Sequence, residues 1–248
     1  MASEFVSKVA SYVTFSFDGR ARLTGHSSDG RERAVLNYVQ QNVQRGNAES
    51  VVSAIESFTD RSWMPILGRE KGCLLDAAVQ KFDPKVALEI GTYCGYSAIR
   101  IASKMTKPDS KLICIEMNPH NYAVATAMIE HAGLSSKVIM LRGTLSDLDD
   151  SLEEFMIEMT APYFDFIFMD QFKDCYLPDF LLLQDKGMLG KGTGIVAETI
   201  GFAEAQNYHN YLKGHRKELE TEIYTSESLL PCKMTVSTYI ANRVNLVS

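Results

Sequence analysis

The chain has 248 residues, of which 46% are hydrophobic and 23% are charged, as is usual for folded globular proteins. This composition excludes a mainly disordered chain, a collagen-like repeat and a small disulfide-stapled protein. The net charge is -6, with 25 basic against 31 acidic residues, and a nucleic-acid partner is not favoured because phosphate binding usually needs a basic excess. The five cysteines are odd in number and form no C-x-x-C pair, which favours reduced thiols in a cytoplasmic protein.

The first 30 residues are expected to form an N-terminal extension. They contain no apolar run long enough for a signal peptide or a membrane span, and they lead into the Gly/Ser/Asp-rich segment TGHSSDGRER. We therefore expect a soluble protein with no membrane partner and a single domain over residues 31–248. The sequence leaves the oligomeric state open.

Three helices are predicted ahead of any strand, because apolar residues recur at helical spacing. They cover residues 31–45, 49–59 and 69–82. After Pro84 the pattern changes to short apolar runs without strict alternation, which are typical of strands buried on both faces of a parallel sheet. The predicted strands are 86–90, 111–116, 137–141, 164–170 and 193–198. Helices are predicted between them at 95–105, 119–133, 147–159 and 176–187.

This alternation predicts an α/β fold with a doubly wound, mostly parallel sheet of the Rossmann-like kind. The C-terminal region departs from it, since residues 218–225 and 233–242 are both strand-like and are joined by a short connection. They are predicted to form an antiparallel hairpin at the sheet edge, which makes seven strands in all.

The loop after the first predicted strand has the pattern E-x-G-x-x-x-G, with Glu89, Gly91 and Gly95, and not the dinucleotide pattern G-x-G-x-x-G. Glycines let a ligand approach the backbone, and a carboxylate at the strand tip favours a cationic or zwitterionic ligand over a pyrophosphate. Glu116 ends the second strand, where it can accept hydrogen bonds from a ribose diol, and Met117 can pack on adenine. Together they indicate a nucleoside without phosphates, such as S-adenosylmethionine (SAM). The alternative is a simple tight turn beside a solvated strand end.

The segments around these residues closely resemble the catechol O-methyltransferase family of SAM-dependent class I methyltransferases. The resemblance runs from about Ala34 to Asn242. It is carried by LNYVQQNVQRGNAESVVSAIESF, ALEIGTYCGYSAIRIA, IEMNPHNYAVATAMIEHAGL, FMDQFKDCYLPDFLLL and LGKGTG.

The resemblance implies a role for each matching residue. The cofactor would contact Leu67, Gly68, Glu89, Gly91, Tyr93, Ser97, Glu116, Met117, Ser146, Asp170 and Gln171. The substrate would contact Trp63, Phe172, Lys173, Thr199 and Leu230, and Lys173 would be the general base. A metal ion, magnesium in the family, would bind Asp170, Glu198 and Thr199.

Several of these positions differ from the family pattern. An adjacent Asp-Asn pair of metal ligands is replaced by Glu198-Thr199, a histidine by Gln171, and a Ser-Gln pair beside adenine by Leu145-Ser146. Magnesium needs near-octahedral oxygen ligands, so a longer carboxylate and a hydroxyl make a weakened or absent metal site an open alternative. Without a metal, Asp170 and Glu198 would hold Lys173 in its charged form, which is a poor base.

The substrate side differs as well, because the family's last-strand glutamate aligns with Leu230, which cannot accept a hydrogen bond from a second hydroxyl. With Trp63, Pro65 and Phe172 this suggests an apolar pocket for an aromatic hydroxyl compound, unless Glu227 substitutes for the missing acceptor.

The sequence therefore predicts a SAM-dependent O-methyltransferase that acts on a catechol-like or other small aromatic substrate. The alternative is an altered homologue that binds SAM, either as a metal-independent enzyme of other chemistry or as a non-catalytic binding protein. The five histidines show no metal-ligand spacing and are expected to be structural or solvated.

Overall fold

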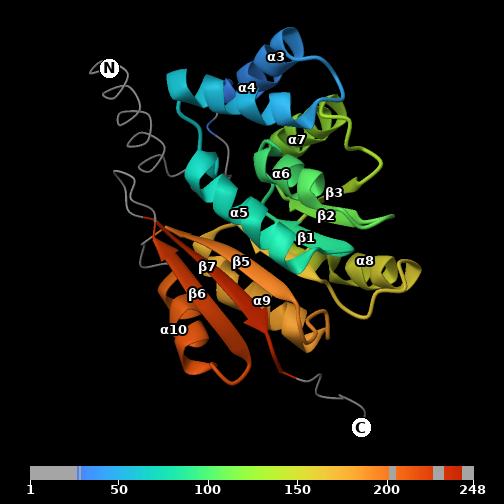
Figure 1. The fold of residues 1–248 in the computed structure, drawn as a ribbon, viewed down its shortest axis with the longest axis vertical. Helices are drawn as coiled ribbons and strands as arrows, with labels where there is room; N and C mark the ends of the chain where they lie inside the picture. The colour runs from blue at the N-terminus through green and yellow to red at the C-terminus, as the bar shows by residue number, and fades with distance from the viewer. Residues whose placement is uncertain (1–26, 28, 201–204, 226–231, 242–248) are drawn as a thin grey trace.

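The computed structural model describes residues 27, 29–200, 205–225 and 232–241 (Figure 1). Most of the expected N-terminal extension lies outside these residues, as do Glu227 and Leu230. The described part begins with α3 (Arg31–Asn42), α4 (Ala48–Arg61) and α5 (Gly68–Phe82), which confirms the three predicted helices.

The sheet has seven strands in the order β3-β2-β1-β4-β5-β7-β6. The strands are β1 (Val86–Ile90), β2 (Lys111–Glu116), β3 (Val138–Arg142), β4 (Phe166–Met169), β5 (Gly194–Ile200), β6 (Leu219–Thr225) and β7 (Cys232–Tyr239). The first five are parallel, whereas β7 is antiparallel to both β5 and β6. The predicted parallel sheet with an antiparallel C-terminal hairpin is thus confirmed.

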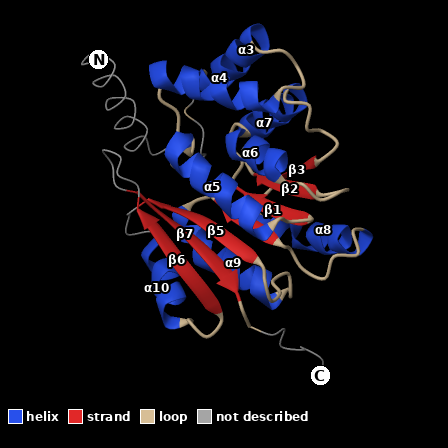
Figure 2. Cartoon of the chain, viewed as in Figure 1, coloured by secondary structure: helices blue, strands red, loops and turns tan. Residues whose placement is uncertain are grey.

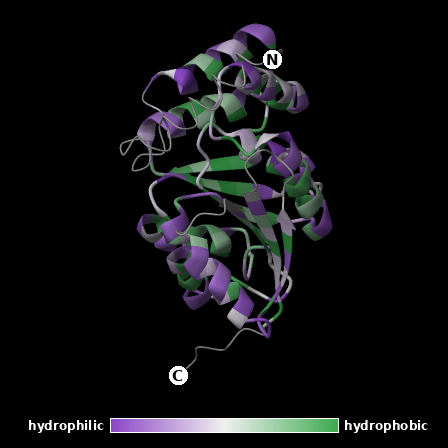
Figure 3. Cartoon of the chain, turned by 90° about the vertical axis from the view of Figure 1, so that its left-hand side faces the viewer, coloured by the Kyte–Doolittle hydropathy of each residue, from purple (hydrophilic) through white to green (hydrophobic). Residues whose placement is uncertain are grey.

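Helices cover both faces of this sheet (Figure 2). Between the strands lie α6 (Tyr96–Lys104), α7 (Pro119–His131), α8 (Leu145–Glu158), the short 3-10 turn η1 (Lys173–Cys175), α9 (Tyr176–Asp185) and α10 (Gln206–Gly214). All five residues of β1 are buried, and Ala87 packs in one core cluster while Leu88 packs in the other. Figure 3 shows the hydrophobic residues concentrated in the strands between the helices. Burial on both faces explains the apolar runs without alternation.

The helix α10 was not predicted from the sequence. Its apolar signal is confined to Tyr208, Tyr211 and Leu212, of which Tyr208 and Leu212 are buried in the core cluster below the sheet edge. The remaining residues of α10 are polar, so its apolar residues show helical spacing over little more than one turn. Among the described residues, every helix is too short or too polar to cross a membrane.

The strand order reverses direction between β1 and β4, which are neighbours in the sheet although β2 and β3 lie between them in the chain. In doubly wound sheets, ligands bind at the carboxyl ends of the strands at such a switch point. The predicted site residues of β1, β2, β4 and β5 all lie at those ends.

Candidate active site

Glu89, near the end of β1, is completely buried. Among the described residues, neither of its carboxylate oxygens has a hydrogen-bond partner. Burial raises the pKa of Glu89 to about 7, although the nearby polar groups of Ser97, Cys114 and Thr92 oppose the rise. A buried carboxylate without a partner is costly, so it would stabilise a positively charged ligand group bound at this strand end.

Gly91, the next glycine of the loop, joins the tips of two strands. Its backbone has a φ of +89°, and a Cβ at this position would lie 2.7 Å from the carbonyl oxygen of Asp170 and 2.7 Å from the amide nitrogen of Gln171. Only glycine combines this conformation with this close approach. The cofactor loop after β1 therefore lies in contact with the segment that follows β4.

Glu116 ends β2 with a buried carboxylate. One oxygen accepts a hydrogen bond from the amide of Tyr93 at 2.8 Å, and the other accepts one from the amide of Asn118 at 2.8 Å. Each carboxylate oxygen can accept more than one hydrogen bond, so a ribose diol can still bind here. Met117 follows with 46% of its surface exposed, available to pack on a ligand ring. Glu89, Gly91 and Glu116 thus fit a cationic nucleoside such as SAM.

The other predicted cofactor residues lie around the same strand ends. Leu67 is buried immediately before α5, Gly68 begins that helix, and Ser146 is exposed in the first turn of α8. The side-chain amide of Gln171 donates to Asp179 at 2.9 Å, whereas its buried carbonyl oxygen has no hydrogen-bond partner among the described residues. Their contacts with a cofactor stay predictions.

The tips of β4 and β5 bring Asp170, Lys173 and Glu198 together. The Lys173 ammonium lies 3.2 Å from Oδ1 of Asp170 and 2.9 Å from Oε2 of Glu198. Only 3% of the Glu198 side chain and 15% of the Lys173 side chain are exposed. This is the arrangement that the sequence predicts for a site without a metal, in which both carboxylates hold Lys173.

Two further residues of this cluster were missed by the sequence analysis. Nζ of Lys71, from α5, lies 2.5 Å from the second oxygen of Glu198. The buried hydroxyl of Tyr176, the first residue of α9, accepts a hydrogen bond from Lys173 at 2.5 Å and lies 3.0 Å from the carbonyl oxygen of Met169. Lys71 lies four residues after the predicted cofactor residue Leu67, and this spacing could have indicated that both residues face the site.

The charges of this cluster shift one another's pKa values. Burial, with the Glu198 carboxylate, raises the pKa of Asp170 to about 6 against the opposing effect of Lys173. Burial alone would raise the pKa of Glu198, but Lys173 and Lys71 outweigh it and lower that pKa. Burial alone would lower the pKa of Lys173, but Tyr176, Glu198 and Asp170 raise it well above its ordinary value. In this arrangement Lys173 is therefore an ammonium.

The carboxylates as placed do not fit a magnesium ion. Magnesium would need their oxygens at about 2.0–2.1 Å, and both oxygens of Glu198 contact ammonium groups instead. The two carboxylates face two ammonium groups, so no negative charge is left to balance a divalent ion. In the described part of the chain, no group of three or more His, Cys, Asp or Glu side chains could hold a metal. Thr199 is described only as part of β5, without its side chain.

The predicted substrate walls are described in part. Trp63 is half-buried, and its carbonyl oxygen accepts a hydrogen bond from Arg31 at 2.5 Å. Phe172 follows the β4 tip with 36% of its surface exposed. Leu230 and Glu227, the remaining residues of this prediction, lie outside the described residues.

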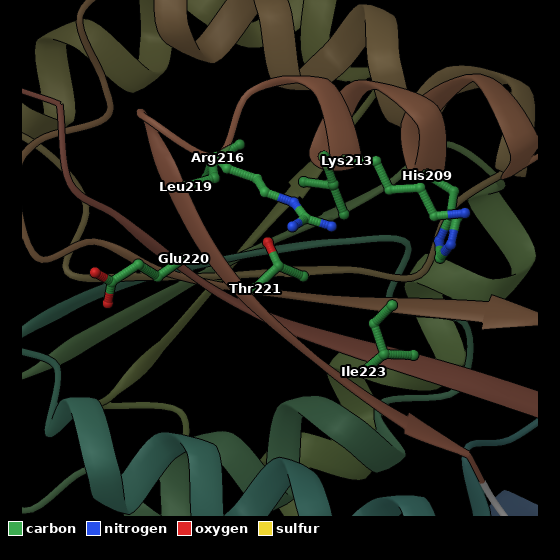
Figure 4. A pocket seen from close by; sticks show the side chains of 8 residues that line it. His209, Lys213, Arg216, Leu219, Glu220, Thr221 and Ile223 are labelled. Carbon is green, nitrogen blue, oxygen red and sulfur yellow. The ribbon is translucent and has the colours of Figure 1, made fainter.

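A groove of about 460 Å³ lies elsewhere, between α10 and the edge strand β6 (Figure 4). Basic side chains line it, including His209, Lys213 and Arg216. Burial, together with Lys213 and Lys233, lowers the pKa of His209. No predicted site residue lines this groove, so it is separate from the predicted site at the strand tips.

The sequence of this chain is similar to those of known methyltransferases. A family model described as O-methyltransferase matches residues 47–191. Catechol O-methyltransferase B of Danio rerio is 39% identical over 188 residues, which cover 75% of this chain and 69% of that protein. Catechol O-methyltransferase of Bos taurus is 35% identical over 188 residues, or 75% and 68% of the two chains.

The solved structures show the same fold at lower identity. An O-methyltransferase from Streptomyces achromogenes in complex with SAM superposes with a TM-score of 0.64 at 19% identity, covering 84% of this chain and 96% of that one. An O-methyltransferase from Bacillus cereus in complex with SAH gives a TM-score of 0.60 at 19% identity, covering 83% and 97%.

Proposed function

This chain belongs to the O-methyltransferase family and is a SAM-dependent O-methyltransferase, and from that premise we propose that its substrate is a small catechol-like or other aromatic hydroxyl compound. The observation that carries the proposal is the Asp170–Lys173–Glu198 cluster at the tips of β4 and β5. It lies against the cofactor loop through the contact of Gly91 with the backbone of Asp170 and Gln171. The half-buried Trp63 and the exposed Phe172 support an aromatic ligand.

The cofactor roles follow from the two unequal carboxylates of β1 and β2. Glu89 is proposed to bind the ammonium group of SAM, because its buried carboxylate has no other hydrogen-bond partner among the described residues. Glu116 is proposed to bind the ribose diol, with Met117 on the adenine ring. Tyr93, Ser97, Leu67 and the remaining predicted residues complete the crevice.

Lys173 is proposed to accept the proton of the substrate hydroxyl. When bound, SAM supplies a methyl carbon that forms a bond with the substrate oxygen while the carbon–sulfur bond breaks and its electron pair stays on sulfur. Lys173 is an ammonium beside Asp170, so it can take the substrate proton only after its own proton has passed to the Asp170 carboxylate 3.2 Å away. The positive charges of the sulfonium and of Lys71 favour the neutral amine. Tyr176 is a positioning residue, since its hydroxyl fixes the Lys173 nitrogen at 2.5 Å.

The decisive experiment measures SAM binding by calorimetry and SAH formation with a panel of catechols and simple phenols. Methylation of a catechol or phenol is the expected result. SAM binding without methylation of any aromatic hydroxyl would contradict the proposal and favour the non-catalytic alternative.

Two further predictions belong with this proposal. A cytoplasmic location is supported by the free thiols of Cys73, Cys94, Cys114 and Cys175. A single domain over residues 31–248 is supported by the seven-stranded sheet and by a core cluster that contains both Val35 of α3 and Met234 of β7.

A further inference from the structure

Glu198 is held between two lysines that come from different parts of the chain. Its Oε1 lies 2.5 Å from Lys71 on α5, and its Oε2 lies 2.9 Å from Lys173 after β4. Lys71 is 127 residues away from Glu198 in the chain, so the contact depends on how α5 packs on the sheet.

The packing of α5 in the core determines where Lys71 lies. Lys71 precedes Leu75 by four residues and Ala78 by seven, and both of these residues are buried in the core. The lysine therefore lies on the buried face of α5, and only 15% of its side chain is exposed. Lysine is rarely buried unless it is paired with an opposite charge. The core contacts of α5 hold the Lys71 ammonium at the tip of β5.

A divalent cation and the Lys71 ammonium compete for the same carboxylate oxygen. A lysine nitrogen at 2.5 Å from Oε1 disfavours magnesium at that oxygen while the contact persists, because the ammonium and the divalent cation would repel each other at this distance. Glutamate has one methylene more than the aspartate of the family pattern, so its carboxylate can reach farther from the strand. Glu198 and Lys71 thus form an ion pair at the position where the resemblance implies a carboxylate–metal pair.

On the basis of the proposed function, we propose that the Lys71 ammonium takes the place of the divalent cation in this chain, so that O-methyl transfer proceeds without a metal. An ammonium has three N–H groups, so one that binds Glu198 can also donate a hydrogen bond to a substrate oxygen. A positive charge fixed beside that oxygen stabilises the negative charge that develops as the hydroxyl proton passes to Lys173, whose own proton has first passed to the Asp170 carboxylate 3.2 Å away. The oxygen then forms its bond with the methyl carbon, and the electron pair of the broken carbon–sulfur bond remains on sulfur.

The test has two independent measurements on the full-length protein, manganese binding by electron paramagnetic resonance and methyl transfer with and without EDTA. The variants are Lys71→Met, which removes the charge at similar length, and Lys71→Arg, which keeps it. Lys81→Met is the matched control, because Lys81 lies on the same helix with 52% of its side chain exposed and pairs with the surface residue Glu222. SAM affinity and thermal unfolding report whether each variant is folded.

The proposal expects wild-type turnover to be unchanged by EDTA and wild-type protein to bind no manganese at micromolar concentrations. Lys71→Met should lose about 100-fold or more in turnover with unchanged SAM affinity, as expected when one fixed charge-stabilising group is removed. The same variant should bind manganese more tightly than the wild type, because Glu198 is released. Lys71→Arg should retain most activity, and Lys81→Met should behave as the wild type.

Tight manganese binding by the wild type, or turnover that EDTA abolishes and magnesium restores, would overturn the proposal. If the wild type methylates no aromatic hydroxyl, the proposed function fails, but the manganese measurement still decides whether Lys71 occupies the place of the metal. If Lys71→Met does not fold, the EDTA and manganese measurements on the wild type and on Lys71→Arg give the answer.

Discussion

The two halves of the predicted site differ in how their buried carboxylates are paired. At the tips of β1 and β2, Glu89 is buried, and among the described residues it has neither a hydrogen-bond partner nor an ion pair. At the tips of β4 and β5, Asp170 and Glu198 already contact Lys173 and Lys71. The first half thus needs a cation from a ligand, whereas the second half carries its own.

This difference assigns SAM binding to the ends of β1 and β2 and proton transfer to the ends of β4 and β5 in the proposed function. A buried carboxylate that has no neighbouring positive charge attracts a cationic ligand. The ends of β1 and β2 are therefore suited to bind SAM selectively. A cluster that is neutral before any ligand binds can exchange a proton among its own groups. Substitutions in the two halves should therefore affect different measured quantities.

The largest effect is expected for Lys173→Ala. If Lys173 is the general base, its loss should lower turnover by about 10²–10⁴-fold, the usual contribution of a positioned base. The affinity for SAM should change little, because Glu89 and Glu116 are untouched. Turnover and calorimetry on the same preparation check this, with the exposed Lys191→Ala as the control. Activity retained within about threefold, well below the contribution of a base, would remove Lys173 from this role.

A second effect is expected from Glu89 and depends on pH. The pKa of Glu89 in the folded protein is raised to about 7 from an ordinary value of 4.5. The folded state therefore binds this proton more tightly, and the corresponding stability is present below pH 4.5 and is lost as the pH rises through 7. The full loss corresponds to about 3 kcal/mol. Denaturant unfolding of the cofactor-free protein should show this decline, and Glu89→Gln should remove it.

The same residue should make SAM binding depend on pH in the opposite direction. The ammonium of SAM is attracted to the ionised form of Glu89, so the affinity should increase as the pH rises through 7. In Glu89→Gln the affinity should be lower by about 1.5–3 kcal/mol and should vary less with pH. An unchanged affinity in the variant would show that the ammonium binds elsewhere.

A smaller effect is expected for Glu116→Ala, which removes the proposed charged acceptor of the ribose. SAM affinity should fall by about 1–3 kcal/mol, measured by calorimetry. Turnover at saturating SAM should be nearly unchanged, since Glu116 has no place in the lysine cluster. Glu220→Ala on the edge strand β6 is a control carboxylate far from the crevice along the sheet. A large loss of turnover at saturating SAM would contradict the separation of the two halves.

Local patterns predicted most of the fold and placed Glu89 and Glu116 at strand ends, whereas Asp170, Lys173 and Glu198 were named from the family resemblance. The strands of the parallel sheet are apolar because both faces are covered, and Glu89 and Glu116 were recognised because each ends a strand. Lys71 and Tyr176 were missed because their roles depend on packing between distant segments. Helix α10 was missed because only Tyr208, Tyr211 and Leu212 carry its apolar face.

The contact between Gly91 and the backbone of Asp170 has a consequence for substrate alignment. Methyl transfer requires the donor carbon and the acceptor oxygen to approach to about 3–3.5 Å in line. In the proposed function the loop after β1 binds the methyl donor and the segment after β4 binds the acceptor, and these two segments meet through main-chain atoms. We therefore expect peptide groups to set the distance between donor and acceptor, so that the surrounding side chains can vary with the acceptor molecule.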